Sequence, residues 1–412
     1  MKISNRNEFE KEKNMKKICK KLMVVMMVLT LVFSMTACGD GNQGSGGNSK
    51  EDNKAAADDN GAPADNGGES EDDGGEAADN GKGDGKKVGI AMPSKDLQRW
   101  SEDGAYMKEA MENNGYTVDI QYANNDIGVQ ASQIENMITG GCDILVIAAI
   151  DGGALSEVLE KAKAADIPVI AYDRLIMNTD AVSYYATFDN EKIGIMQGQY
   201  IADKLDLENQ AGPFNFEIFT GPTDDNNVNF YFGGAMSVLQ KYVDEGKLVI
   251  RSGTEVSMAA CATPNWSQEE AQKRMDNIIA KSYTGGEKLD AVLSSNDSVA
   301  NGITNALLTA GYTEEDFPII TGQDCEITSV KNMLKGLQSM SVFVDTRRLA
   351  NVTADMVDAI MNGEEPEINN TADYDNGTGI IPTYLCEPQV CDIDNYKEVL
   401  IDSGYYTEDR LQ

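Results

Sequence analysis

The feature that most constrains the fold of this chain is a regular alternation that begins at Lys86. Short apolar runs recur, and most are separated by segments with helical spacing of their apolar residues. A strand and a helix together take about 25 to 30 residues, which is typical of βαβ units in a parallel sheet. The runs are "KVGIAM", "TVDIQYA", "CDILVIAAI", "IPVIAYD", "VSYYATF", "FNFEIFTG", "KLVIRSG", "LDAVLSSND", "PIITGQD" and "SMSVFVD".

The apolar runs also predict how the sheets are covered. Runs such as "ILVIAAI" are apolar at consecutive positions, which indicates strands buried on both faces by helices. Residues 130–140 and 268–282 have the helical spacing expected of such a cover. Because this many units exceed one compact sheet, a chain of 412 residues is expected to form two doubly wound α/β lobes.

Residues 1–38 have the pattern of an export signal rather than of a folded element. Lysines at 16, 17, 20 and 21 precede an apolar run, and the small residues of "SMTACG" follow it. A Cys directly after Ala37 predicts a bacterial lipobox, in which Cys38 is lipidated and becomes the new N-terminus. The alternative is a membrane-spanning helix, for which the run falls slightly short of the usual ~20 residues. Translation could begin at Met1 or at Met15.

Residues 39–85 are expected to form a disordered, acidic, Gly-rich linker. The segment contains no Leu, Ile, Val, Phe, Tyr, Trp or Met, so it cannot bury apolar area. A lipidated Cys38 followed by such a tether predicts an exported protein that is held at the outer face of the cell membrane by its lipid anchor alone.

Composition excludes several classes of function. The formal net charge of −34 argues against nucleic acid, because phosphates would be repelled. The chain has no histidine, which excludes Ser-His-Asp triads and the usual zinc sites. An enzyme built on Asp, Glu, Lys or Tyr stays possible. No phosphate loop or calcium loop of the EF type is present. Cys386 and Cys391 could bridge, although free thiols are the expected state.

Polar residues gather where the predicted strands end. Ligands of open parallel sheets bind beyond the carboxyl ends of the strands, and nearly every predicted strand here ends in a carboxylate, an amide or a guanidinium. Helix capping is the alternative, and it is the preferred interpretation for Asp126, Asp151 and Asp297. Capping explains poorly the Asp173-Arg174 pair and the run 224–227, which offer more polar groups than one cap needs.

This mixture of side chains suits a sugar. Each hydroxyl both donates and accepts, so a polyol can pair with a carboxylate and with Arg or Asn at once. The C–H face of a pyranose packs on an aromatic ring. Both tryptophans of the chain, Trp100 and Trp266, lie in polar segments among the candidate residues, although core filling is the alternative for either.

The residues also resemble a known family. "KVGIAMPSKDLQRW", "DILVIAAIDG", "VIAYDRLIMNTDAV", "YYATFDNEKIG", "DDNN", "SSND", "TGQD" and "YDNG" are similar to segments of type I solute-binding proteins of ABC sugar importers. Within that family the resemblance is to xylose-binding and ChvE-type multiple-sugar-binding proteins. It extends from Lys86 to about Ile401 in order and without large gaps.

The resemblance implies two Rossmann-like lobes joined by three crossover strands, with a monosaccharide between them. The implied lobes are residues 86–190 plus 346–382 and residues 191–345 plus 383–412. One departure is Val344, since the family often has Lys two residues before the position of Thr346. The implied sugar contacts are Lys95, Arg99, Trp100, Asp173, Arg174, Asp225, Asn227, Trp266, Asn296 and Asp324.

The function implied is a lipid-anchored monosaccharide-binding subunit for an aldose of the xylose, glucose or galactose type. It would close on the sugar and deliver it to the permease and ATPase subunits of an ABC importer, as a monomer and without a cofactor or metal. The alternatives are a sugar receptor for chemotaxis or two-component sensing, a carbohydrate-active enzyme using Asp173 and Asp324, and a sugar-responsive repressor. The charge and the lack of a helix-turn-helix before Lys86 argue against the repressor.

Overall fold

The computed structural model describes residues 85–412. The predicted export signal, the lipidation site Cys38 and the linker up to residue 84 lie outside the described residues. Within residues 85–412, none of the helices combines the length and the apolar character that crossing a bilayer requires.

The first sheet has six strands, all parallel to their neighbours, in the order β11-β5-β4-β3-β1-β2. This is the doubly wound arrangement that the alternating apolar runs predict, with an extra strand, β11, at one edge. The strands are β1 (Lys87–Met92), β2 (Thr117–Tyr122), β3 (Ile144–Ile147), β4 (Val169–Tyr172), β5 (Tyr184–Phe188) and β11 (Thr383–Cys386).

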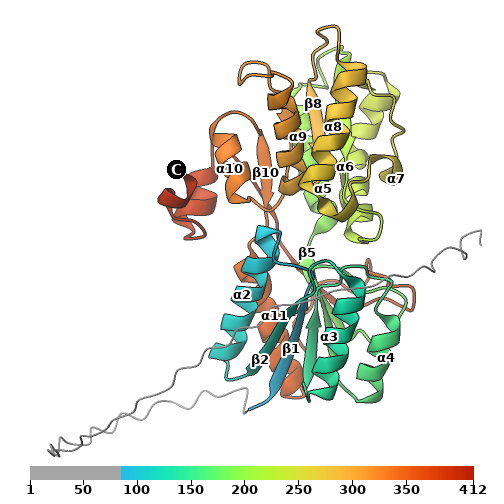
Figure 1. Cartoon of the computed structure of the whole chain (residues 1–412), viewed down its shortest axis with the longest axis vertical. Helices are drawn as coiled ribbons and strands as arrows, with labels where there is room; N and C mark the ends of the chain where they lie inside the picture. Colours follow the sequence, from blue (N-terminus) through green and yellow to red (C-terminus); the bar gives the residue numbers. More distant parts are fainter. Residues whose placement is uncertain (1–84) are drawn as a thin grey trace, which may run out of the picture. The chain divides into compact units, whose positions relative to one another are not determined.

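Helices cover both faces of this sheet (Figure 1). On one face, Val88 and Ile90 pack in the cluster that includes residues of α2 (Gln98–Asn113) and α11 (Thr346–Met361). On the other, Leu145 and Ile147 pack with α3 (Ile127–Thr139) and α4 (Ser156–Ala164). Successive strand residues point to opposite faces, so a strand buried on both is apolar throughout. We call this sheet with its four helices the first half.

The second sheet has four parallel strands in the order β7-β6-β8-β9. They are β6 (Phe214–Phe219), β7 (Leu248–Ile250), β8 (Ala291–Ser294) and β9 (Ile319–Ile320). One face packs against α5 (Asn190–Lys204) and α6 (Asn227–Asp244), and the other against α8 (Gln268–Ser282) and α9 (Asp297–Thr309). This sheet and these helices form the second half, and α3 and α8 confirm the two helices predicted from spacing.

Two glycines allow α5 and α6 to touch along their backbones. A Cβ at Gly194 would lie 2.1 Å from the carbonyl oxygen of Tyr231, and one at Gly234 would lie 2.2 Å from that of Glu191. No side chain fits at such a distance, so Gly is required at both positions. The close approach fixes the start of α6, which carries residues of the candidate site.

The described chain passes between the two halves three times, from β5 to α5, from β10 (Met340–Phe343) to α11, and from β11 to β12 (Gln389–Asp392). β10 and β12 pair with each other antiparallel. A parallel bridge from Gln323 to Val342 joins β10 to the segment after β9. The sequence patterns did not predict β11 or β12. The lobe boundaries at 190, 345 and 382 stay a prediction. Strand pairing places Thr383–Cys386, which the prediction assigned to the second lobe, in the first sheet.

Short elements complete the described chain: α7 (Met258–Cys261), η1 (Pro264–Trp266), α10 (Ile327–Leu334), a π-helical turn at Lys397–Asp402, and η3 (Glu408–Leu411). Cys386 and Cys391 are buried free thiols on different strand pairs, so the bridge considered from their spacing is not formed. Free cysteines at 142, 261 and 325 are likewise buried.

The capping interpretation of three aspartates is confirmed for one and wrong for two. Asp126 caps α3 by accepting from the Val129 N–H. Asp151 instead accepts from the Gly153 N–H at 2.8 Å and closes a local turn. α9 is capped by Asn296 and not by Asp297. Asn296 has the extended backbone that an N-cap needs, whereas Asp297 is already the first residue of the helix.

Candidate functional site

A pocket with a cavity volume of about 30 Å³ lies between the two halves, at the carboxyl ends of their strands. Parallel strands end at one edge of a sheet, so residues far apart in the sequence meet there. From the first half it is lined by Leu97, Arg99, Trp100, Asp173 and Arg174, and from the second by Asp225, Tyr231, Trp266, Asn296, Gln323, Asp324 and Glu326.

Arg99 stands in the first turn of α2, which follows β1, and carboxylates surround its guanidinium. Its Nε lies 3.0 Å from Asp103 Oδ2, its Nη2 pairs with Asp173, and its Nη1 lies 3.8 Å from Asp324 Oδ1. Tyr172, at the end of β4, donates to Asp103. Burial raises the pKa of Asp103 to about 7, against the opposing effect of Arg99. The guanidinium of Arg99 is therefore bound by carboxyl groups of the first half and also lies near Asp324 of the second half.

Asp173 follows β4 in the left-handed backbone region, with φ of 61°. Its carbonyl oxygen accepts from Tyr185, from Thr187 Oγ1 at 2.9 Å and from Asn227 Nδ2 at 2.7 Å. Left-handed backbone is uncommon for residues other than Gly, although Asp tolerates it, and it persists where the surroundings fix it. The three donors provide that constraint and leave the carboxylate to face Arg99.

Arg174 joins the halves. Its Nε lies 3.0 Å from Asp225 Oδ2, while its Nη1 donates to the backbone carbonyls of Ala149 at 3.1 Å and Ile150 at 3.2 Å. Asp225 Oδ2 also accepts from the indole N–H of Trp266 at 3.1 Å. Burial raises the pKa of Asp225, and Arg174 opposes that shift. The arrangement is a donor–acceptor chain across the pocket.

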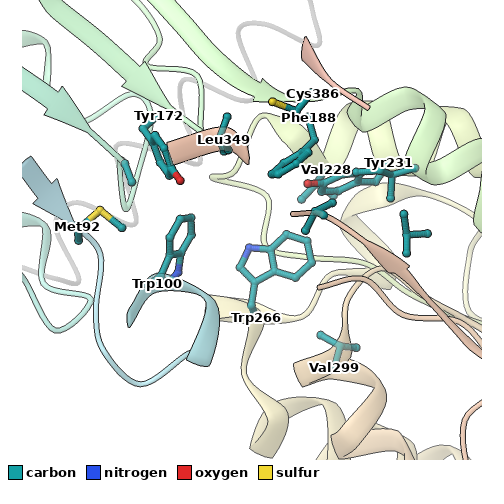
Figure 2. Packing of buried hydrophobic residues seen from close by; sticks show 14 of the residues in the cluster. Met92, Trp100, Tyr172, Phe188, Val228, Tyr231, Trp266, Val299, Leu349 and Cys386 are labelled. Atoms are coloured by element: carbon teal, nitrogen blue, oxygen red, sulfur yellow. The ribbon is translucent and has the colours of Figure 1, made fainter. Parts of the chain in front are cut away.

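Trp100 and Trp266 both line the pocket, and Figure 2 shows their indole rings among the buried side chains of the cluster. The guanidinium carbons of Arg99 and Arg174 lie 4.8 Å and 5.2 Å from the ring centroid of Trp100. Trp266 packs edge-to-face on Tyr231, with centroids 6.2 Å apart. A Cβ at Gly221 would lie 2.2 Å from the Trp266 ring, so only Gly leaves room for the indole in this position.

Asn296 and Asp324 follow β8 and β9. The Asn296 Oδ1 caps α9 by accepting from Val299 N at 3.0 Å. Asn296 therefore serves as a helix cap and also lines the pocket. Asp324 has a φ of 98°, and burial raises the pKa of its carboxyl group. Cys325 and Trp266 also have positive φ, at 50° and 55°. Backbone strain of this kind gathers at functional sites.

The structure brings most of the predicted sugar contacts together. Arg99, Trp100, Asp173, Arg174, Asp225, Trp266, Asn296 and Asp324 all line the pocket. Asn227 does not line it, because its side chain is used to fix the Asp173 carbonyl and to accept from Tyr185 at 3.0 Å. Lys95 is exposed, with its Nζ 4.7 Å from the centroid of the Tyr122 ring. Val344 is fully buried in the apolar core.

Four lining residues were not among the predicted sugar contacts, namely Leu97, Tyr231, Gln323 and Glu326. Tyr231 follows Asn227 by one helical turn on α6, and Gln323 directly precedes Asp324, so helical spacing and adjacency could have identified them. Glu326 accepts weakly from Ser298 and Asn301, both at 3.4 Å. Burial, and then the charge of Asp324, raise its pKa to about 8.

Residues 88–365 match the family model described as "Periplasmic binding protein domain". The chain is 50% identical over 327 residues to the multiple sugar-binding periplasmic receptor ChvE of Rhizobium radiobacter, covering 79% of this chain and 92% of that protein. It is 34% identical over 325 residues to the D-xylose-binding periplasmic protein of Escherichia coli K12, with 79% and 92% covered.

Among solved structures, an ABC transporter solute-binding protein from Clostridium phytofermentans with bound β-D-glucose is 61% identical, with a TM-score of 0.77. It is matched over 79% of this chain and 100% of that chain. These relatives are binding proteins and a receptor, so the expectation of a protein other than an enzyme holds. The two parallel sheets are those of the same fold. The chain belongs to the periplasmic binding protein family.

Proposed function

We propose that this protein binds a monosaccharide between its two halves and delivers it to the permease of an ABC importer. The relatives support the ligand class, because they are described as binding multiple sugars, D-xylose and β-D-glucose. The transporter context is supported by the 61% identical solute-binding protein. An aldose of the glucose, xylose or galactose type is the proposed ligand.

The observation that carries the proposal is the composition of the pocket wall. Guanidinium donors and carboxylate acceptors alternate around it, and indole rings stand among them. A sugar hydroxyl donates and accepts at once, so it can pair with Arg174 and Asp225 in the same ring position. The C–H face of a pyranose gives the indoles of Trp100 and Trp266 an apolar surface.

The proposed mechanism is closure around the ligand. Each half contributes part of the wall, and within residues 85–412 only three chain passages connect the halves, so these passages form a natural hinge. A sugar that forms hydrogen bonds with both halves stabilises the closed arrangement over an open one. The size of the shift is set by how much more tightly the sugar binds the closed form than the open form. The permease can then recognise the closed form by its outer surface.

We place the protein at the outer face of the cell membrane. The periplasmic relatives support an extracytoplasmic location. The lipobox pattern ending at Cys38 and the polar residues 39–85 support a lipid anchor on a long tether. Labelling growing cells with an alkyne fatty acid tests the anchor: the wild type should carry the label and Cys38→Ser should not. Equal labelling of both would remove Cys38 as the lipidation site.

The test of the sugar-binding proposal is calorimetric titration of the purified protein with D-glucose, D-xylose, D-galactose and L-arabinose. One site per chain and measurable heat with at least one aldose is the expected result. If none of the four binds, the proposal is wrong. Uptake of labelled sugar by cells with and without the gene then separates import from sensing, which the description of ChvE as a receptor keeps as a second candidate.

A further inference from the structure

The side chain of Gln323 has one polar atom that the fold leaves unused. The residue is 3% exposed, and its Oε1 has no hydrogen-bond partner among residues 85–412. Buried polar atoms are normally hydrogen-bonded, so each exception in a native structure calls for a physical reason. Gln323 also lines the pocket between the halves, where a ligand can supply the missing donor.

The orientation of the Gln323 amide is fixed by its neighbours. Its Nε2 donates to Asp324 Oδ1 at 3.2 Å and approaches Tyr231 Oη at 3.4 Å. The NH₂ end therefore faces Asp324, and the carbonyl end of the amide points away from that carboxyl group. The backbone of Gln323 is fixed as well, because its carbonyl accepts from Asp297 N at 3.0 Å.

We propose that Gln323 Oε1 accepts a hydrogen bond from one hydroxyl of the bound sugar and selects for that hydroxyl. The inference rests on the proposed sugar-binding function and adds a specificity-determining residue to it. Arg99 and Arg174 can only donate, and each already pairs with a carboxylate, Asp173 and Asp225 respectively, whereas Oε1 is an acceptor for which residues 85–412 supply no donor. A sugar that lacks the matching hydroxyl leaves this acceptor buried and unpaired, which is how a polar site rejects a deoxy analogue.

The surroundings of Gln323 suit such a role. Tyr231, which its amide approaches, packs edge-to-face on Trp266, so the amide is adjacent to one of the proposed ring-stacking surfaces. Asp324, its other partner, is approached by Arg99 from the first half. The amide is thus held between an aromatic group and a charged group of the wall, and neither consumes its carbonyl oxygen.

The experiment is a cycle of protein variants and sugar analogues, measured by calorimetry on the full-length protein. The variants are wild type and Gln323→Met, and the ligands are D-glucose and its 2-, 3-, 4- and 6-deoxy analogues. We expect Gln323→Met to weaken glucose binding about 10- to 100-fold. For one deoxy sugar, wild type should bind with an affinity lower than for D-glucose by a similar factor. Gln323→Met should bind that deoxy sugar almost as well as it binds D-glucose.

That coupling between one residue and one hydroxyl is the readout that a purely structural role would not give. A uniform loss for glucose and for all four analogues would overturn the proposal and leave Gln323 as a support for Tyr231 and Asp324. A wild type that binds no monosaccharide would instead refute the proposed function, so the two failures are distinguishable.

A matched control is Gln197→Met. Gln197 is also a buried glutamine whose Oε1 has no partner among the described residues, but its amide donates to the backbone of Ser295 and Gly322 and does not line the pocket. It should lower thermal stability without selective coupling to any hydroxyl. If Gln323→Met folds poorly, Gln323→Asn keeps the amide, withdraws its oxygen by one methylene and should show the same selective loss.

Discussion

The two halves contribute opposite electrostatics to the pocket that they share. Both guanidinium groups of the wall, Arg99 and Arg174, come from the first half, whereas the second half contributes the carboxyl groups of Asp225 and Asp324. The cations are anchored on their own side, by Asp103, Asp173 and backbone carbonyls. Complementary charges of this kind attract the two halves and fix their relative orientation, whereas burial of apolar surface alone is not directional.

The largest expected effect comes from breaking the pair that joins the halves. Arg174→Leu leaves Asp225 with the Trp266 indole as a donor, in a buried position. An uncompensated buried charge is costly, so we expect sugar affinity to fall at least about 100-fold, or roughly 3 kcal/mol. Calorimetric titration measures this.

The control for that prediction is Lys163→Met. It removes an equally charged group whose partner, Asp180, lies on the exposed surface. Surface pairs contribute little, so its affinity should match wild type within about twofold. If Arg174→Leu bound sugar as well as Lys163→Met does, the inter-half pair would have no part in binding.

The acidic wall of the second half should make stability fall as pH rises. Glu326 has a pKa of about 8 in the folded protein against an ordinary value of 4.5. The folded state therefore holds a proton that the unfolded state releases. This stabilisation is complete below about pH 4.5 and is lost as pH rises through about 8.

Denaturant titrations at pH 5 and pH 8.5 should show a smaller fall in unfolding free energy for Glu326→Gln than for wild type, by about 2 kcal/mol. Asp103 in the first half, with a pKa of about 7, should produce a similar fall at lower pH, which Asp103→Asn removes. Identical pH profiles for wild type and Glu326→Gln would show that this carboxyl titrates normally.

A smaller effect is expected from displacing an aromatic wall without touching its residue. Gly221→Ala places a methyl group into the space of the Trp266 ring, 2.2 Å from its carbons, and must move the indole. Sugar affinity should fall about 10-fold, close to the effect of Trp266→Ala. The fall in affinity can be measured by titrating the sugar and following the quenching of tryptophan fluorescence.

Gly233→Ala is the matched control, because nothing lies within 4 Å of a Cβ at that helical position. It should leave affinity unchanged and stabilise α6 slightly. Equal affinities for Gly221→Ala and Gly233→Ala would mean that the position of the indole does not matter.

The smallest effect is expected for Lys95→Ala. The family resemblance implies a sugar contact here, yet the side chain is exposed and rests over Tyr122 outside the pocket wall. We therefore expect less than a twofold change in affinity, measured by the same titration. A loss above 10-fold would show that the first half moves Lys95 onto the ligand on closure.

Much of the site was predictable because it follows from strand position. Asp173 directly follows an apolar run, Asn296 follows another after two serines, and parallel sheets place such positions at one edge. Gln323 and Tyr231 were missed for different reasons. Gln323 stands at a polar strand end, but the family resemblance implied a contact only at its neighbour Asp324. A Tyr within an apolar helix looks like core. Asn227 shows the converse, since the family resemblance implied a sugar contact there although its amide supports the backbone of Asp173.

The sequence by itself determined the two parallel sheets, their covering helices and the polar strand ends, because these depend on local periodicity and on the buried character of each run. The tertiary structure decided what the polar groups do. It chose Asn296 over Asp297 as the cap of α9, added β11 to the first sheet and left Gln323 Oε1 without a partner in the described part of the chain. These outcomes depend on distances between segments far apart in the chain, which no local pattern encodes.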